Sequence, residues 1–340
     1  MTSFFRAGRP AEVVNAPENQ QPQDFRPRTT MGTRAGRLLD EVPSLGPLTN
    51  LQGDWTGTGF SILSLPNQFA VNPTAKFRLM MNATIENTTF TPITGPIPDR
   101  GNTQPDIFFL GLTYMQKVSD RNTLEGIHVE PGIFLNLPAN PVQTTPSVCR
   151  LATIPHGDAV LAQGAWHVFE GAPSFAVADT TPFTLDKDGN RINDTSANYM
   201  APFTTADPPP NIPKNAVMNP NVVLQQFNDN LISEGKKFIN TTVFQVNANP
   251  VGGIANVPPF SADPSEPGGI TNIPFVVQNA NATSLSAIFW INEVQNTDGS
   301  LFLVLQYSQT VLLFFEVPGP DGNMVPLFWP HIAVASLIKR

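Results

Sequence analysis

The last strand of the chain is predicted over PHIAVASLI, residues 330–338. Because alternate residues of a β-strand share one face, His331, Ala333 and Ala335 should lie together on the same side. Two methyl-sized side chains beside an imidazole leave open space in front of a group that can bind a metal. If this strand closes a barrel, that space becomes an interior pocket.

Similar strand patterns occur along most of the chain. The run FRLMMNATIE, residues 77–86, alternates apolar with mostly polar residues, which is typical of a half-buried antiparallel strand. Further strands, separated by turns rich in Gly, Asn and Asp, are predicted over 48–65, 107–115, 126–137, 148–154, 286–294 and 301–315. We therefore expect a mainly β fold, an antiparallel up-and-down β-barrel of the lipocalin or nitrobindin kind, in which the first and last strands pair.

Two stretches differ from this pattern. Residues 1–45 are rich in arginine and proline and are expected to form a partly disordered N-terminal arm. Residues 46–340 are expected to form a single barrel domain with a loop-rich elaboration at about 175–270. One helix is predicted inside this elaboration, with Asn219 as its cap, Pro220 in its first turn and Gly235 at its end. Its shared face would carry Val223, Phe227 and Leu231.

Composition excludes several partners. The net charge of −8 offers no basic field for nucleic acid or anionic membranes. No apolar run is long enough for a transmembrane helix, and the start of the chain lacks the apolar core of a signal peptide. We therefore expect a cytoplasmic protein, in which Cys149 is a buried thiol. Charged residues are only 14% of the chain and hydrophobic residues 41%, a composition that is compatible with a homodimer.

The two ends of the chain resemble one known family. LQGDWTGTG, residues 51–59, resembles the Gly-x-Trp-x-Gly-x-Gly opening of the nitrobindin-like haem-binding barrels, which are similar in shape to lipocalins and fatty-acid-binding proteins. HIAVASLIKR, residues 331–340, is similar to the last strand of that family. The resemblance covers about thirty residues, and the domains of the family are far shorter than this chain.

The resemblance implies haem b as cofactor and His331 as the axial ligand of its iron. The residues expected around the porphyrin are Trp55, Gly57, Gly59, Ala333 and Ala335. A neutral imidazole binds iron well and leaves the opposite face open to a small molecule. The expected ligand is a small apolar or reactive molecule, such as a peroxide, nitric oxide or an oxidised lipid.

Two further histidines allow other hypotheses. His128 and Glu130 should share one side of a strand, and His156 lies in a turn. On the distal side of a haem, His128 or His156 would supply acid–base chemistry. Together with Glu130 they would instead form a non-haem metal site, unless His128 and Glu130 only form a structural hydrogen bond.

A third hypothesis is a metal-free, lipocalin-like carrier of a hydrophobic ligand, with no ligand on His331. The chain has no Walker loop, dinucleotide fingerprint or Gly-x-Ser-x-Gly elbow, so ATPase, dehydrogenase and serine hydrolase functions are not favoured.

Overall fold

The computed structural model describes residues 44–66, 77–100, 105–139, 146–185, 190–193, 203–248, 269–318 and 323–340. The chain divides into two units, Met1–Val42 and Pro43–Arg340, and all described residues belong to the second unit. The arm expected over residues 1–45 therefore lies almost entirely outside the described residues.

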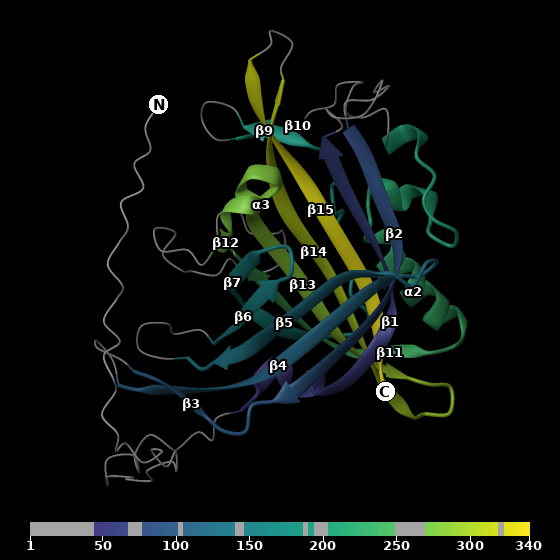
Figure 1. Ribbon diagram of the computed structural model, residues 1–340. Coiled ribbons are helices and arrows are strands. Elements are labelled where there is room, and N and C mark those ends of the chain that lie inside the picture. Colours follow the sequence, from purple (N-terminus) through teal and green to yellow (C-terminus); the bar gives the residue numbers. More distant parts are fainter. Residues whose placement is uncertain are drawn as a thin grey trace, which may run out of the picture. The chain divides into compact units, whose positions relative to one another are not determined.

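Ten antiparallel strands form a closed up-and-down barrel in the described part of the chain (Figure 1). In order around the barrel they are β1 (Gly53–Pro66), β2 (Phe77–Pro92), β4 (Ile107–Asp120), β5 (Gly126–Leu137), β6 (Ser147–Ile154), β7 (Asp158–Gly164), β11 (Lys237–Asn247), β13 (Asn281–Gln295), β14 (Leu301–Pro318) and β15 (Met324–Lys339). β1 pairs with β15 from Trp55↔Lys339 to Ile62↔Ile332, which closes the barrel. The predicted mainly β fold, with its first and last strands paired, is confirmed.

Shorter elements surround this barrel. They are the strands β3 (Ile97–Asp99), β8 (Trp166–Glu170), β9 (Phe183–Leu185), β10 (Arg191–Asn193) and β12 (Ile270–Asn272), and the helices η2 (Gly46–Leu51), η3 (Lys214–Val217), α2 (Val222–Ser233) and α3 (Pro274–Asn279). The stretch expected to be a loop-rich elaboration contains β11, which is a full strand of the barrel. The sequence did not indicate this because β11 has mixed polar and apolar residues on both faces.

Helix α2 corresponds to the predicted helix, with corrections to its start and to its buried face. Its N-cap is Asn221 rather than Asn219, so Pro220 precedes the helix instead of lying in its first turn. Its buried positions are Leu224, Asn228 and Leu231. Leu231 of the predicted face is therefore confirmed, whereas Val223 and Phe227 are only partly buried and the neighbouring Leu224 and Asn228 are buried in their place. Gly235 follows the helix at φ +81°, a left-handed conformation that glycine adopts without strain, so the predicted end is confirmed.

Two apolar clusters pack on opposite sides of the barrel wall. Inside, the ring of Phe134 lies 5.7 Å from that of Phe244 and 5.4 Å from that of Phe289, and these aromatics fill much of the interior. Outside, Phe60 and Val334 on the paired strands β1 and β15 belong to a second cluster with η3 and α2. Since both sides of this wall are apolar, the interior of the barrel is not the only core of the protein.

Candidate functional site

Three histidines line one cavity of about 90 Å³ inside the barrel. His128 comes from β5, His156 from the turn between β6 and β7, and His331 from β15. We call this space the histidine cavity. Its other walls include Ser61, Thr84, Gln116, Tyr307, Gln309 and Ala333. Residues that are far apart in the sequence therefore meet there because the barrel closes.

His331 points into this cavity from the last strand. Its Nε2 lies 3.2 Å from the Ser61 hydroxyl of β1, and its backbone pairs with Val311 of β14. Burial, together with charge repulsion from nearby His128 and His156, lowers the pKa of His331 to about 4. At neutral pH the imidazole is therefore uncharged, which is the form that binds metals and accepts protons.

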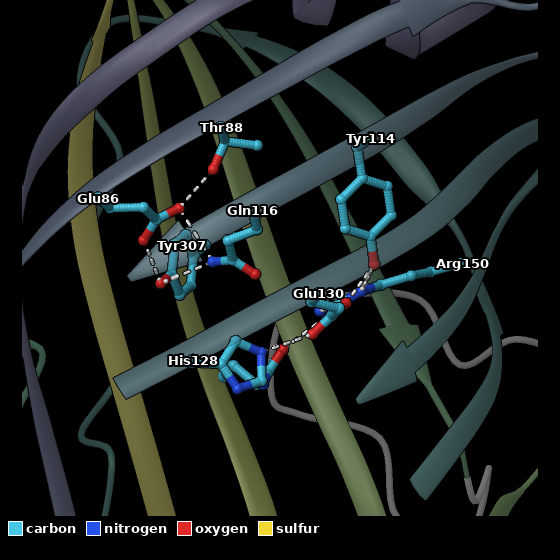
Figure 2. Close-up of polar contacts among 9 residues, drawn as sticks. Glu86, Thr88, Tyr114, Gln116, His128, Glu130, Arg150 and Tyr307 are labelled. Atoms are coloured by element: carbon cyan, nitrogen blue, oxygen red, sulfur yellow. Dashed lines mark hydrogen bonds and ion pairs between the residues drawn. The ribbon is translucent and has the colours of Figure 1, made fainter. Parts of the chain in front are cut away.

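Glu130 lies at the centre of a buried polar cluster (Figure 2). Its Oε1 is 2.6 Å from Nη2 of Arg150 and also accepts a hydrogen bond from the Tyr114 hydroxyl. Its Oε2 lies 3.2 Å from Nε2 of His128. Burial alone would raise the pKa of Glu130, but the charge of Arg150 and the hydrogen bonds outweigh burial and lower this pKa to about 2. We call Glu130, Arg150, Tyr114 and His128 the Glu130 cluster.

The local sequence explains how this cluster fits into the barrel. Because successive side chains of a strand point to opposite faces, His128 and Glu130 lie on the same side of β5, as predicted. The strand continues through Pro131 to Leu137. Gly132 pairs with Tyr114 on β4, and a Cβ at Gly132 would lie 2.4 Å from the Tyr114 ring. The glycine therefore makes room for the ring that reaches Glu130.

A second buried carboxyl group lies beside this cluster. Glu86 accepts hydrogen bonds from the hydroxyls of Tyr307 (2.6 Å) and Thr88 (2.8 Å) and from Nε2 of Gln116 (2.9 Å), as Figure 2 shows. Burial raises the pKa of Glu86, and these hydrogen bonds only partly oppose the rise. Gln116 and Tyr307 also line the histidine cavity, so Glu86 is linked to that cavity through its own partners.

Neither Glu86, Tyr307, Tyr114 nor Arg150 was expected from the sequence to be functional. All four side chains are buried, and each lies on a strand with mixed polarity. The available signal was a set of polar residues at alternate positions, Thr84, Glu86 and Thr88, on one strand. Such a set usually faces solvent, and here it faces the interior.

Of the other residues expected around a porphyrin, Ala333 lines the histidine cavity, whereas Trp55 lies elsewhere. Trp55 pairs with Lys339, eight positions from His331, which corresponds to about 26 Å along β15 at about 3.3 Å per residue. Its Nε1 donates a hydrogen bond to the Leu51 carbonyl at 2.6 Å. The structure thus brings together the three histidines and Ala333, and it places Trp55 at the other end of the barrel wall.

The glycines of the first strand serve barrel closure. A Cβ at Gly57 would lie 2.0 Å from the Ser336 carbonyl oxygen, and one at Gly59 would lie 2.1 Å from the Val334 carbonyl oxygen. Ala335, opposite Gly59, is buried at the same seam. The Gly-x-Gly pattern therefore permits a close approach of β1 to β15.

The expected non-haem metal site is not assembled. No group of three His, Cys, Asp or Glu residues positioned to hold a metal ion is found among the residues that the structure describes. The Glu130 carboxylate is instead bound by Arg150 and Tyr114.

Within the same described ranges, none of the helices has the length and apolar character needed to span a membrane.

No family model matches the chain, and no curated protein matches its sequence. Among solved structures, the chain is similar to the crystal structure of Rv2717c from M. tuberculosis, with a TM-score of 0.38 and 14% sequence identity over 88% of this chain and 99% of that chain. The barrel is established by the strand pairings of this chain and not by this similarity.

Proposed function

We propose that this chain is a ligand-binding β-barrel protein whose site is the histidine cavity. The observation that carries this proposal is the convergence of three imidazoles from separate elements on one interior space. Placing polar side chains inside a barrel costs free energy unless they are hydrogen-bonded. An apolar core would stabilise the fold without this cost. A binding function accounts for this cost.

The walls favour a small, polar or reactive molecule, of the peroxide or nitric oxide class. Gln116, Ser61 and Thr84 supply hydrogen-bonding groups around the histidines. A volume of about 90 Å³ is below the roughly 300–1,000 Å³ of pockets for drug-sized ligands. A long hydrophobic ligand is less favoured, because Phe134, Phe244 and Phe289 pack against one another in the interior and belong to its apolar cluster.

Haem b on His331 is the second candidate. It is favoured by one observation: a neutral, buried imidazole faces the interior from the last strand. The donor therefore fits a haem iron. The space does not, because about 90 Å³ between the described side chains is too small for a porphyrin. Haem would require the residues that line the cavity to move, and we derive no chemical step from it.

Two measurements test these candidates. In protein labelled with ¹⁵N at histidine, acetohydroxamic acid, a small unreactive mimic of a hydroperoxide, should shift the ring signals of the three cavity histidines. The signal of His167, on β8 outside the cavity lining, should not move. If the three signals remain unmoved at saturating probe, the cavity is not a binding site.

Titration with hemin tests the second candidate separately. A Soret band that is lost in His331→Ala and kept in the matched control His167→Ala would establish haem binding through His331. Free hemin that gives the same spectrum with and without protein would exclude it.

A further inference from the structure

The Glu130 carboxylate is held on both of its oxygens. Oε1 interacts with Arg150 and Tyr114, and Oε2 faces Nε2 of His128 at 3.2 Å. Arg150 is itself fixed, because its Nε donates to the Tyr114 hydroxyl at 3.0 Å and its Nη1 donates to Oε1 of Gln309 at 2.6 Å. Figure 2 shows Tyr114, Glu130 and Arg150 converging from β4, β5 and β6. A carboxylate that cannot rotate fixes the orientation of the ring that it binds.

This contact also determines which nitrogen of His128 carries the proton. With a pKa of about 2, Glu130 is ionised at neutral pH and can only accept a hydrogen bond. The hydrogen of a neutral His128 ring must therefore lie on Nε2, which leaves a lone pair on Nδ1. Within the described part of the chain, Nδ1 has no hydrogen-bond partner, and the His128 side chain lines the histidine cavity.

We infer that His128 is the proton acceptor of the histidine cavity, with Glu130 as its positioning residue, and that the site takes small ligands with a weakly acidic O–H group, such as hydroperoxides. This inference rests on the proposed ligand-binding function. When such a ligand binds, its O–H bond breaks and the bonding electrons remain on oxygen. The proton forms a new N–H bond at Nδ1, while Nε2–H continues to donate to Glu130, whose negative charge stabilises the resulting imidazolium.

The groups around His128 favour it over the other two histidines. Burial lowers the pKa of His331 to about 4 and also lowers that of His156, so neither readily keeps a proton. His128 is the cavity histidine that contacts a buried carboxylate. The further charged or titratable groups that face this region are Glu86 from β2, Asp158 beside His156, and Arg150 behind Glu130.

The histidine ring signals of ¹⁵N-labelled protein test this inference directly. Without ligand, His128 should show a proton on Nε2 only; with saturating acetohydroxamic acid, both nitrogens should be protonated. Acetamide, which lacks the acidic hydroxyl, should leave His128 with one proton. Glu130→Gln should weaken the binding of acetohydroxamic acid about tenfold or more, because the imidazolium loses its charged partner. The affinity for acetamide should change little.

A second variant controls for a loss of binding that is caused by unfolding. Glu130→Gln leaves Arg150 without its anion, so Glu130→Gln/Arg150→Met removes the whole ion pair and should retain the fold, checked by near-ultraviolet circular dichroism. If either folded variant binds acetohydroxamic acid like wild type, or if His128 in the wild-type complex keeps a single proton, the inference is overturned. If neither probe moves any cavity histidine, the proposed function itself fails and the inference fails with it.

Discussion

Arg150 and Glu130 form an ion pair inside the barrel, with Nη2 and Oε1 at 2.6 Å and side chains that are 3% and 0% exposed. Such a pair is stable only while both partners are present, because either charge alone would be buried without compensation. The pair therefore acts as a single unit, and it joins β5 to β6 beside the histidine cavity.

Breaking this pair should strongly destabilise the protein. We expect Arg150→Met to lower the free energy of unfolding by about 3–5 kcal/mol, and Glu130→Gln/Arg150→Met to recover much of the loss. Urea unfolding followed by circular dichroism measures both. Lys214→Met, which breaks the exposed Lys214–Asp207 pair, is the matched control and should have little effect. Equal, small losses in all three variants would contradict this prediction.

Stability should fall as the pH drops from 6.5 towards 4. The pKa of His331 is lowered from its ordinary value of 6.5 to about 4, so the unfolded chain binds this proton more readily than the folded protein does in that range. The free energy of unfolding therefore rises with pH between these values. In His331→Gln this part of the pH dependence should be weaker, as measured by thermal unfolding at a series of pH values. An unchanged pH profile would show that His331 is not buried as a neutral group.

Gly57→Ala should weaken the seam between β1 and β15. The added Cβ would lie 2.0 Å from the Ser336 carbonyl oxygen and 2.7 Å from Cα of Leu337, and backbone atoms cannot move aside without shifting a strand. We expect a loss of about 1–3 kcal/mol in the free energy of unfolding, which is the usual cost of overpacking. Gly126→Ala is the control, because a Cβ at Gly126 would meet no atom within 4 Å. Equal stability of the two variants would mean that the close approach is not required.

Cys149 should react slowly with thiol reagents in the folded protein. Cys149 is half-buried rather than fully buried as predicted, but its burial still raises the pKa of the thiol to about 12, and the thiolate is the reactive form. Alkylation by iodoacetamide at neutral pH, followed by mass spectrometry, should therefore be slow in buffer and fast in urea. Rapid modification without denaturant would contradict the described position of Cys149 on β6.

The alternation of apolar and polar residues in the sequence was sufficient to predict most of the barrel. Apolar residues at every second position, with Gly, Asn and Asp between the strands, indicated the antiparallel strands and the pairing of the first with the last. The period of two also placed His128 beside Glu130. Strand β11 was missed because its pairing partner, β13, lies more than thirty residues further along the chain, and only that pairing makes its mixed sequence a strand.

The sequence by itself therefore determined the class of fold, the closing strands and the individual histidines. The tertiary structure decided which face of each strand points inward. On β2 the polar residues Thr84 and Glu86 face the interior, while Phe77 belongs to the outer cluster with η3 and α2. The physical reason is that η3 and α2 provide an apolar cover outside the barrel. Apolar side chains are then buried on the outer face, and the inner face is left for the polar side chains of the histidine cavity and the Glu130 cluster.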